Sequence, residues 1–401
     1  MQKILVCACF LSLLYFFIIL PEYLTKEEIL ANTEKNVRRQ YTSAAPAPPQ
    51  RKVKKILAWT KLFDRDFLLY HNHKPLSSHT GFASCPIYKE CEWTIEKSAV
   101  ESADAVLFHI FPNDFQLTDV PTYRNPQQKW IAMNLEPPIR FREGKMAKLD
   151  GLFNVTATYE EDADISLPYG FYYKRKTALK NYLPNNKNRT KPVVWMVSRC
   201  HTMSRREVYA DDLKKYIDVD IFGDCGKKAP TKGSPPLNVD FRTKLAKDYY
   251  FYLAFENSDC VDYITEKFWT TLLAGLVPIV RGQLPRYEKH APPGSYINAD
   301  AFFSYADLAE YLKFLIDNPA EYNKYFKWRE WYTIGTTGAF INLDVHCKIC
   351  ELLHTQPEYH KVYNMSTRYS SFHRCFSYHH NLPQIDFEVE KAYQDEFANF
   401  L

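Results

Sequence analysis

The chain has 401 residues, of which 46% are hydrophobic and 16% aromatic, so it can form two domains of ordinary size with well-filled cores. It carries 51 basic and 47 acidic residues, which are interspersed and leave a formal net charge of only +4. Because no long basic run is present, nucleic acid is excluded as an expected partner.

The sequence opens with an uninterrupted apolar run over residues 4–20, ILVCACFLSLLYFFIIL. At ~1.5 Å per residue, a helix of this length spans about 25 Å, which is adequate for a thin early-secretory bilayer. The alternative is a cleaved signal peptide, but Pro21 and Glu22 follow the run and no A-x-A pattern is present. An uncleaved transmembrane anchor is therefore favoured.

Charge around this run sets its orientation. Lys3 precedes it and glutamates follow it, so the positive-inside rule predicts type II topology, with everything after the anchor in the lumen. After the anchor the chain is polar and ends in AAPAPP, a composition typical of an extended stem. The expected segments are a cytosolic tail over 1–3, the anchor over 4–20 and the stem over 21–52.

A lumenal location gives meaning to the cysteines and to the N-x-S/T triplets. Eight cysteines lie outside the apolar run, and an even number in an oxidising compartment predicts disulfides. Asn154, Asn188 and Asn364 each begin a triplet and are candidate glycan acceptors.

Short apolar runs follow the stem, each ending in polar residues and separated by longer connections, which is typical of buried parallel strands. They form two sets, 53–59, 103–109 and 129–135, then 193–197, 219–223, 251–255 and 277–280.

The stretch between the two sets is turn-rich and is expected to be a linker. The predicted fold is therefore α/β, with two Rossmann-like domains facing a cleft, and ligands are expected beyond the carboxyl ends of the strands. The expected boundaries are 53–180, linker 181–192, 193–345, and a C-terminal segment over 346–401.

The most informative segment runs from residue 251 to 282. A buried strand ends at polar residues, after which Thr265 is placed to cap a helix that Gly275 ends. A strand, a polar loop and a helix N-terminus together favour an anion site. The expected apolar face of the helix consists of Phe268, Trp269, Leu272 and Leu273.

Lys267 lies in the first turn of this helix, where the helix dipole favours negative charge. A bound polyanion would offset that unfavourable placement. The alternative interpretation is an ordinary solvated surface lysine.

These residues carry a family resemblance. The segment FYLAFENSDCVDYITEKFWTTLLAGLVPIVRG resembles the donor-binding signature of the α1,3-fucosyltransferases, which are Golgi enzymes that use GDP-fucose. Weaker similarity extends from about Lys54 to about Leu353. The resemblance implies the GT-B glycosyltransferase fold and a single-pass Golgi membrane protein. It also implies two partners, GDP-fucose and a glycan or glycoprotein acceptor.

The resemblance also implies the donor site. Arg206 falls where the family has a nucleotide-binding arginine, although Arg205 could fill that role if the loop shifts by one residue. The loop departs from its relatives at Arg199, where they often have asparagine. The implied donor-binding residues, with Glu256 and Asn257 orienting fucose or ribose hydroxyls, are Ser198, Arg206, Glu256, Asn257, Tyr263, Glu266 and Lys267.

Glu136 is the candidate catalytic base. It follows an expected strand, and Pro137 and Pro138 prevent that strand from continuing, which leaves a carboxylate at the carboxyl end. Spacing alone is more typical of a surface-loop carboxylate. The match of WIAMNLEPP to the W-x-x-M-N-x-E-x-P context of the family implies the catalytic role.

Metal dependence is the alternative for the diphosphate site. The D-x-D triplets 162–164 and 218–220 have the form with which another glycosyltransferase class holds Mn²⁺, but so short a pattern arises by chance. We expect no required cofactor and no metal site, although Mn²⁺ or Mg²⁺ can stimulate.

The C-x-x-C from Cys347 to Cys350 resembles half of a zinc site, but it lacks a second pair at the usual distance. The family implies instead that Cys85 and Cys91 bond to it. Such bridges would clamp the C-terminal segment onto the first domain.

The leading functional hypothesis is an inverting α1,3-fucosyltransferase acting on a GlcNAc hydroxyl. The tetrapeptides VSRC and FGDC resemble the branch of the family that modifies the N-glycan core. The alternatives are transfer to a protein-attached (O-linked) acceptor, and a nucleotide-sugar or glycan-binding protein that has lost catalysis. An intact Glu136, Arg206 and Lys267 argue against the inactive protein.

Overall fold

A computed structural model describes residues 51–61, 70–71, 74–75, 82–83, 85–111, 115, 118, 120–141, 146–186, 188–227, 239–282, 287–336, 345–359 and 361–376. Met1–Lys52 and Val53–Leu401 form separate units, and the fold below is that of the second. The expected tail, anchor and nearly all of the stem lie outside the described residues. Within the described parts of the chain, no helix is both long and apolar enough to cross a bilayer.

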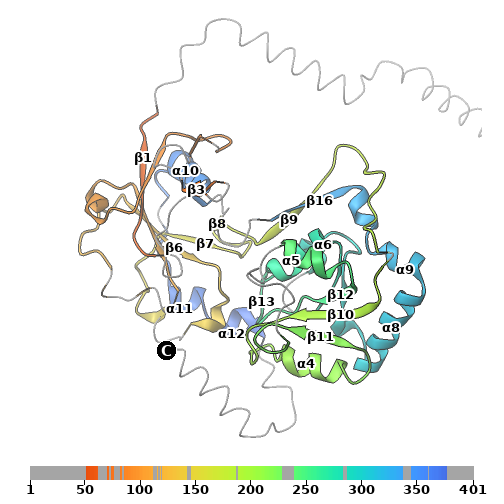
Figure 1. The fold of residues 1–401 in the computed structure, drawn as a ribbon. Helices are drawn as coiled ribbons and strands as arrows, with labels where there is room; N and C mark the ends of the chain where they lie inside the picture. Colours follow the sequence, from red (N-terminus) through yellow and green to blue (C-terminus); the bar gives the residue numbers. More distant parts are fainter. Residues whose placement is uncertain are drawn as a thin grey trace, which may run out of the picture. The chain divides into compact units, whose positions relative to one another are not determined.

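The first sheet has six strands, and every neighbouring pair is parallel. Its central strands β5 and β6 are buried along their whole length, as apolar strands of a parallel sheet should be. In spatial order the strands are β4 (Cys91–Thr94), β1 (Lys54–Ala58), β5 (Ala105–His109), β6 (Lys129–Asn134), β7 (Val155–Thr158) and β8 (Ile165–Ser166). Figure 1 labels β1, β6, β7 and β8 of this sheet.

The second sheet is also parallel throughout and has five strands. In spatial order they are β11 (Val219–Phe222), β10 (Lys191–Met196), β12 (Tyr249–Leu253), β14 (Val277–Val280) and β15 (Ile297–Asn298). All seven strands expected from the sequence are present. Strands β4, β7, β8 and β15 were not expected, because each is only two to four residues long.

Helices in the second half of the chain pack on this sheet, and residues of α8 and α9 share one core with β10, β12 and β14. The α-helices are α4 (Arg206–Leu213), α5 (Val239–Leu245), α6 (Glu266–Ala274), α7 (Tyr287–His290), α8 (Tyr305–Asp317), α9 (Pro319–Lys324), α10 (Val345–Thr355), α11 (Met365–Arg368) and α12 (Ser371–Arg374). Short 3-10 helices are η2 (Lys97–Glu101), η4 (Pro138–Arg140), η5 (Ala299–Ala301) and η6 (Lys327–Glu330).

Among the described residues, three short antiparallel pairs complete the strands: β2 (Tyr70–His71) with β3 (Lys74–Pro75), β9 (Gly170–Lys174) with β16 (Tyr332–Thr336), and β13 (Asp259–Cys260) with β17 (Cys375–Phe376). The β9–β16 ribbon lies against α6. A Cβ on Gly170 would lie 2.4 Å from the Trp269 ring, so only glycine lets β9 approach the helix this closely.

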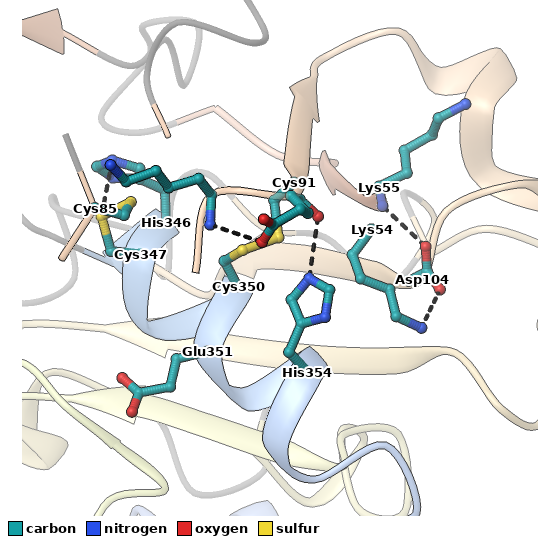
Figure 2. The surroundings of a disulfide bond; sticks show 12 residues. Lys54, Lys55, Cys85, Cys91, Asp104, His346, Cys347, Cys350, Glu351 and His354 are labelled. Atoms are coloured by element: carbon teal, nitrogen blue, oxygen red, sulfur yellow. Dashed lines mark hydrogen bonds and ion pairs between the residues drawn. A yellow bond between two sulfur atoms is a disulfide. The ribbon is translucent and has the colours of Figure 1, made fainter. Parts of the chain in front are cut away.

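The C-terminal segment is bound to the first sheet, as expected. Figure 2 shows the two disulfides that join α10 to it, Cys85–Cys347 and Cys91–Cys350, with sequence separations of 262 and 259. These are the cysteines that the family resemblance paired. Chain-entropy models give about 5 kcal/mol for closing loops of this length.

The same segment is also bonded to the second half of the chain. Cys375 is bonded to Cys260, and Cys200 to Cys225, two pairings that the sequence left open. Just before Cys375, Tyr363, Met365 and Tyr369 pack in a core of the first sheet. The C-terminal segment therefore contacts both α/β regions.

Candidate active site

Glu136 lies just beyond β6, at the carboxyl end of the first sheet. Asn134, the last residue of β6, holds it by two hydrogen bonds: its Oδ1 accepts from the Glu136 amide at 2.9 Å and its Nδ2 donates to the Glu136 carbonyl at 2.6 Å. The Tyr169 hydroxyl donates to the Leu135 carbonyl at 2.6 Å. Because the ladder of β6 has ended, these contacts fix the backbone on which the carboxylate is carried.

The pKa of Glu136 is raised by burial, and a repulsion from Glu266 adds to this. Attraction by Lys267 and Arg199 opposes the increase without cancelling it. A raised pKa makes the carboxylate a better acceptor for the proton of a hydroxyl group. Glu136, which follows the last residue of β6, therefore lies within electrostatic range of Glu266 and Lys267 at the start of α6.

Helix α6 begins and ends where the sequence predicts. Thr265 is its N-cap and accepts from the Lys267 amide, and Gly275 ends it with a left-handed φ of 79°. The expected apolar face is wrong at Leu273, which is 37% exposed. At ~100° per residue Leu273 lies about 140° around the helix from Phe268, at the margin of the buried face.

Lys267 is bound by two carboxylates. Its Nζ lies 3.0 Å from Glu256 Oε2 and 3.2 Å from Glu266 Oε1, and it donates to Thr265 Oγ1 at 2.8 Å. The side chain is only 18% exposed, so a solvated surface lysine is excluded. Glu256 and Glu266 offset its charge within the protein, so a bound polyanion at Lys267 stays a prediction.

These three groups shift one another's pKa values. Burial raises the pKa of Glu256, with only partial opposition from Lys267. Burial would also raise the pKa of Glu266, but attraction by Lys267 and Arg242 outweighs it, so that pKa is lowered. Burial would lower the pKa of Lys267, yet the two carboxylates raise it, so the ammonium is charged at neutral pH.

Glu256 is nearly fully buried, and its Oε1 accepts from both the amide and the hydroxyl of Thr265 at 2.8 Å. The residue thus stabilises the N-terminus of α6 and positions Lys267. If Glu256 also contacts a sugar hydroxyl, as the sequence predicts, it must do so while it keeps its contacts with Thr265 and Lys267.

Arg205 and Arg206, in the loop after β10 and at the start of α4, both remain candidates for the nucleotide-binding arginine. Arg206 begins α4 and is buried, and its guanidinium donates to the carbonyls of Phe255 at 2.9 Å and Arg199 at 3.3 Å. Arg205 has a left-handed φ of 50°, and its buried Nε and Nη1 have no hydrogen-bond partner among the described residues. The Arg206 Nε likewise has no partner among the described residues, so each arginine keeps a buried, unpaired N–H.

The remaining predicted donor residues surround these loops. Ser198 is exposed just after β10. The Asn257 carbonyl accepts from the Ser204 amide at 3.3 Å, while its side-chain oxygen has no partner in the described structure. Tyr263 is buried, with its ring 5.0 Å from that of Tyr159 and 6.2 Å from that of Tyr169. Tyr263 is thereby held beside the Glu136 loop.

The two D-x-D triplets are engaged by protein groups. Asp162 pairs with Arg368 and Arg374, and Asp164 accepts from the hydroxyls of Tyr359 and Tyr363. In the other triplet, Asp220 pairs with lysines and accepts from a tyrosine. A metal ion that bound at either triplet would have to displace these protein partners from the carboxylates.

The candidate glycan acceptors differ in exposure. Asn154 is 2% exposed, and its amide bonds to Arg124 at 3.0 Å and to the Lys361 carbonyl at 3.3 Å. The folded protein therefore does not present Asn154 for glycosylation, contrary to the sequence prediction. Asn188 and Asn364 are exposed and stay predictions.

Three residues of the site were missed by sequence reasoning. Asn134 holds the Glu136 backbone, Tyr169 holds the neighbouring carbonyl, and Arg242 lowers the pKa of Glu266. A polar residue at the end of an apolar strand, two positions before the carboxylate, was a signal for Asn134. Tyr169 and Arg242 act on residues distant in sequence, and no local pattern indicates them.

Comparison with known proteins identifies the family. Residues 51–170 match the model "Fucosyltransferase, N-terminal", and residues 186–368 match "Glycosyltransferase family 10 (fucosyltransferase) C-term". A Drosophila melanogaster protein, "Alpha-(1,3)-fucosyltransferase C", is 33% identical over 77% of this chain and 75% of its own length. A Bos taurus 3-galactosyl-N-acetylglucosaminide 4-alpha-L-fucosyltransferase is 36% identical over 72% of this chain and 78% of its own.

Two further matches are partial or more distant. The Drosophila melanogaster "Glycoprotein 3-alpha-L-fucosyltransferase A" is 37% identical over 74% of this chain, which spans 58% of that protein. A crystal structure of an alpha1,3-fucosyltransferase with GDP-fucose aligns with 80% of this chain and 96% of its own, at 16% identity and a TM-score of 0.48. On the family matches and the extent of the similarity to its relatives, the chain belongs to glycosyltransferase family 10, the fucosyltransferases.

Proposed function

We propose that the chain is an inverting α1,3-fucosyltransferase that moves fucose from GDP-fucose to a GlcNAc hydroxyl of a glycan, with the N-glycan core as acceptor. The observation that carries the proposal is that Glu136, just after β6, interacts electrostatically with Lys267 at the start of α6, while Tyr169 and Gly170 join the Glu136 loop to that helix. A base and a diphosphate-binding cation are the two groups that this displacement needs. The family and the glycoprotein-modifying relative support it.

In this mechanism the Glu136 carboxylate accepts the proton of the acceptor hydroxyl. The hydroxyl oxygen forms a bond to the anomeric carbon of fucose while the bond from that carbon to the diphosphate oxygen breaks, which inverts the configuration. Negative charge grows on the departing GDP, and Lys267 with Arg205 or Arg206 stabilises it. Tyr263 and Asn257 orient the sugar nucleotide.

The direct test incubates the full chain with GDP-fucose and a glycan array that contains N-glycan core structures, galactosyl-GlcNAc antennae and O-linked glycopeptides. We expect release of GDP in step with α1,3-linked fucose on core GlcNAc, detected by mass spectrometry and linkage analysis. Fucose only on O-linked glycopeptides would favour the second candidate function. Binding of GDP-fucose without transfer to any acceptor would contradict catalysis.

We also propose that transfer needs no bound metal, because the cationic side chains can supply the charge that a metal would otherwise supply. After exhaustive chelation with EDTA, we expect at least half of the activity to persist, even if Mn²⁺ or Mg²⁺ stimulates it. A parallel assay of the dialysed protein with excess Ca²⁺-saturated EDTA controls for effects of the chelator. Complete loss that Mn²⁺ alone restores would favour a D-x-D metal site.

The proposed location is the Golgi membrane, with type II topology and a lumenal catalytic part. The apolar run over residues 4–20 and its flanking charges support an anchor. The four disulfides among the described cysteines are also typical of an oxidising compartment.

A further inference from the structure

The β9–β16 ribbon has one buried face and one exposed aromatic face. Tyr172 pairs with Ile334, and both pack against the core. On the other face, Phe171 and Tyr173 are 47% and 55% exposed, with ring centroids 6.3 Å apart and ring planes inclined by 32°. We call this pair of rings the aromatic face.

Phe171 is held in place by the opposite strand. It pairs with Gly335, and a Cβ on that glycine would lie 2.4 Å from the Phe171 ring. The ring therefore covers the bare backbone of β16, an arrangement known to stabilise glycine in a sheet. The aromatic face is thus a fixed part of the ribbon and needs no rearrangement before it can bind.

This face is continuous with the candidate active site. Tyr169, just before β9, donates to the Leu135 carbonyl beside Glu136. Gly170 then contacts Trp269 of α6, two residues after Lys267. At ~3.3 Å per residue, Phe171 and Tyr173 lie about 7 and 13 Å along the strand from Tyr169. The aromatic face therefore leads outward from the place where the base and the donor helix meet.

We propose that the aromatic face binds acceptor sugars beyond the one that receives fucose, an inference that rests on the proposed function. Aromatic rings carry a negative face, which attracts the partly positive C–H groups on the flat side of a pyranose ring. Two rings at this spacing offer room for neighbouring sugars, and the adjacent Thr333 and Tyr173 hydroxyls can bond to sugar hydroxyls. A protein partner would require a surface of about 800 Å² per side, far more than two rings provide.

The test compares two acceptors with the full chain: the smallest saccharide that the wild type fucosylates and a larger glycan that contains it. For Tyr173→Ala we expect KM for the larger glycan to rise about three- to tenfold. KM for the smaller acceptor should change by less than a factor of about two, with GDP-fucose KM as the internal reference. Tyr173→Phe keeps the aromatic ring, so its KM for the larger glycan should stay close to the wild-type value.

Phe303→Ala is the matched control, because Phe303 is a fully exposed aromatic residue between η5 and α8, away from the ribbon. It should leave both KM values at the wild-type level. Equal KM changes for the two acceptors in Tyr173→Ala, or no change for either, would overturn this inference while the wild type remains active. A wild type that fucosylates no acceptor would overturn the proposed function itself, and the inference with it.

Discussion

Glu136→Gln is expected to lower kcat by about 10²- to 10⁴-fold, the range typical of losing a general base. Glutamine keeps the size and the hydrogen-bonding shape of the side chain, but it cannot take the acceptor proton. The backbone is held by Asn134 whichever side chain is present, so the loop should stay in place. GDP affinity, measured by calorimetric titration, should therefore change little. More than a tenth of wild-type kcat at saturating substrates would place the base elsewhere.

The pH profile provides a second measurement of the same variant. Because burial raises the pKa of Glu136, the carboxylate is protonated at higher pH than an ordinary glutamate, and wild-type kcat/KM should fall as pH decreases through that value. Glu136→Gln should lack this acidic limb in its residual activity. Glu351→Gln makes the same charge change at an exposed position of α10 and should keep the wild-type profile (Figure 2).

Lys267→Ala is expected to weaken GDP and GDP-fucose binding by roughly tenfold to a hundredfold, because a charge-assisted contact is worth about 1.5–3 kcal/mol. Transfer should slow further, since the charge of the leaving group grows in the transition state. Lys267→Arg keeps the charge and should lose less affinity. Lys313→Ala removes an exposed lysine from α8 and is the matched control.

The ion pairs of Lys267 make a stability measurement necessary beside the titration. Removing the ammonium leaves Glu256 and Glu266 close together and without this partner, so unfolding free energy should fall by about 3–5 kcal/mol. The GDP dissociation constant must therefore be measured below the new melting temperature, with the folded fraction checked by circular dichroism. An unchanged dissociation constant in folded protein would make Lys267 a purely structural residue.

Local patterns predicted much of the fold. Seven strands, the capping Thr265 and the terminating Gly275 are specified by apolar runs and by polar or glycine residues at their ends. Prediction was incomplete where a residue's environment comes from distant segments. No local pattern indicated that Glu256 pairs with Lys267, and its contact with a sugar hydroxyl stays a prediction. Asn154 occurs in an acceptor triplet, yet Arg124 and the C-terminal segment bury it.

The pairing of β9 with β16 could not be predicted from the sequence either. Each strand has five residues, and the two are about 160 residues apart in the sequence. The sequence of neither strand indicates that it pairs with the other. The pairing depends on the surface against which the two strands pack. That surface is α6, and only the folded structure places it there.

The C-terminal disulfides have a consequence for the order of events during biosynthesis. Cys91 begins β4 in the first sheet, but its partner Cys350 is made 259 residues later. At about 5–20 residues per second, the ribosome needs roughly 13–50 s to span that interval. Until then the first sheet lacks both α10 and its covalent closure, and Cys85 and Cys91 are exposed to exchange with other thiols. A nascent chain that stops before Cys375 would likewise leave Cys260 without its disulfide partner.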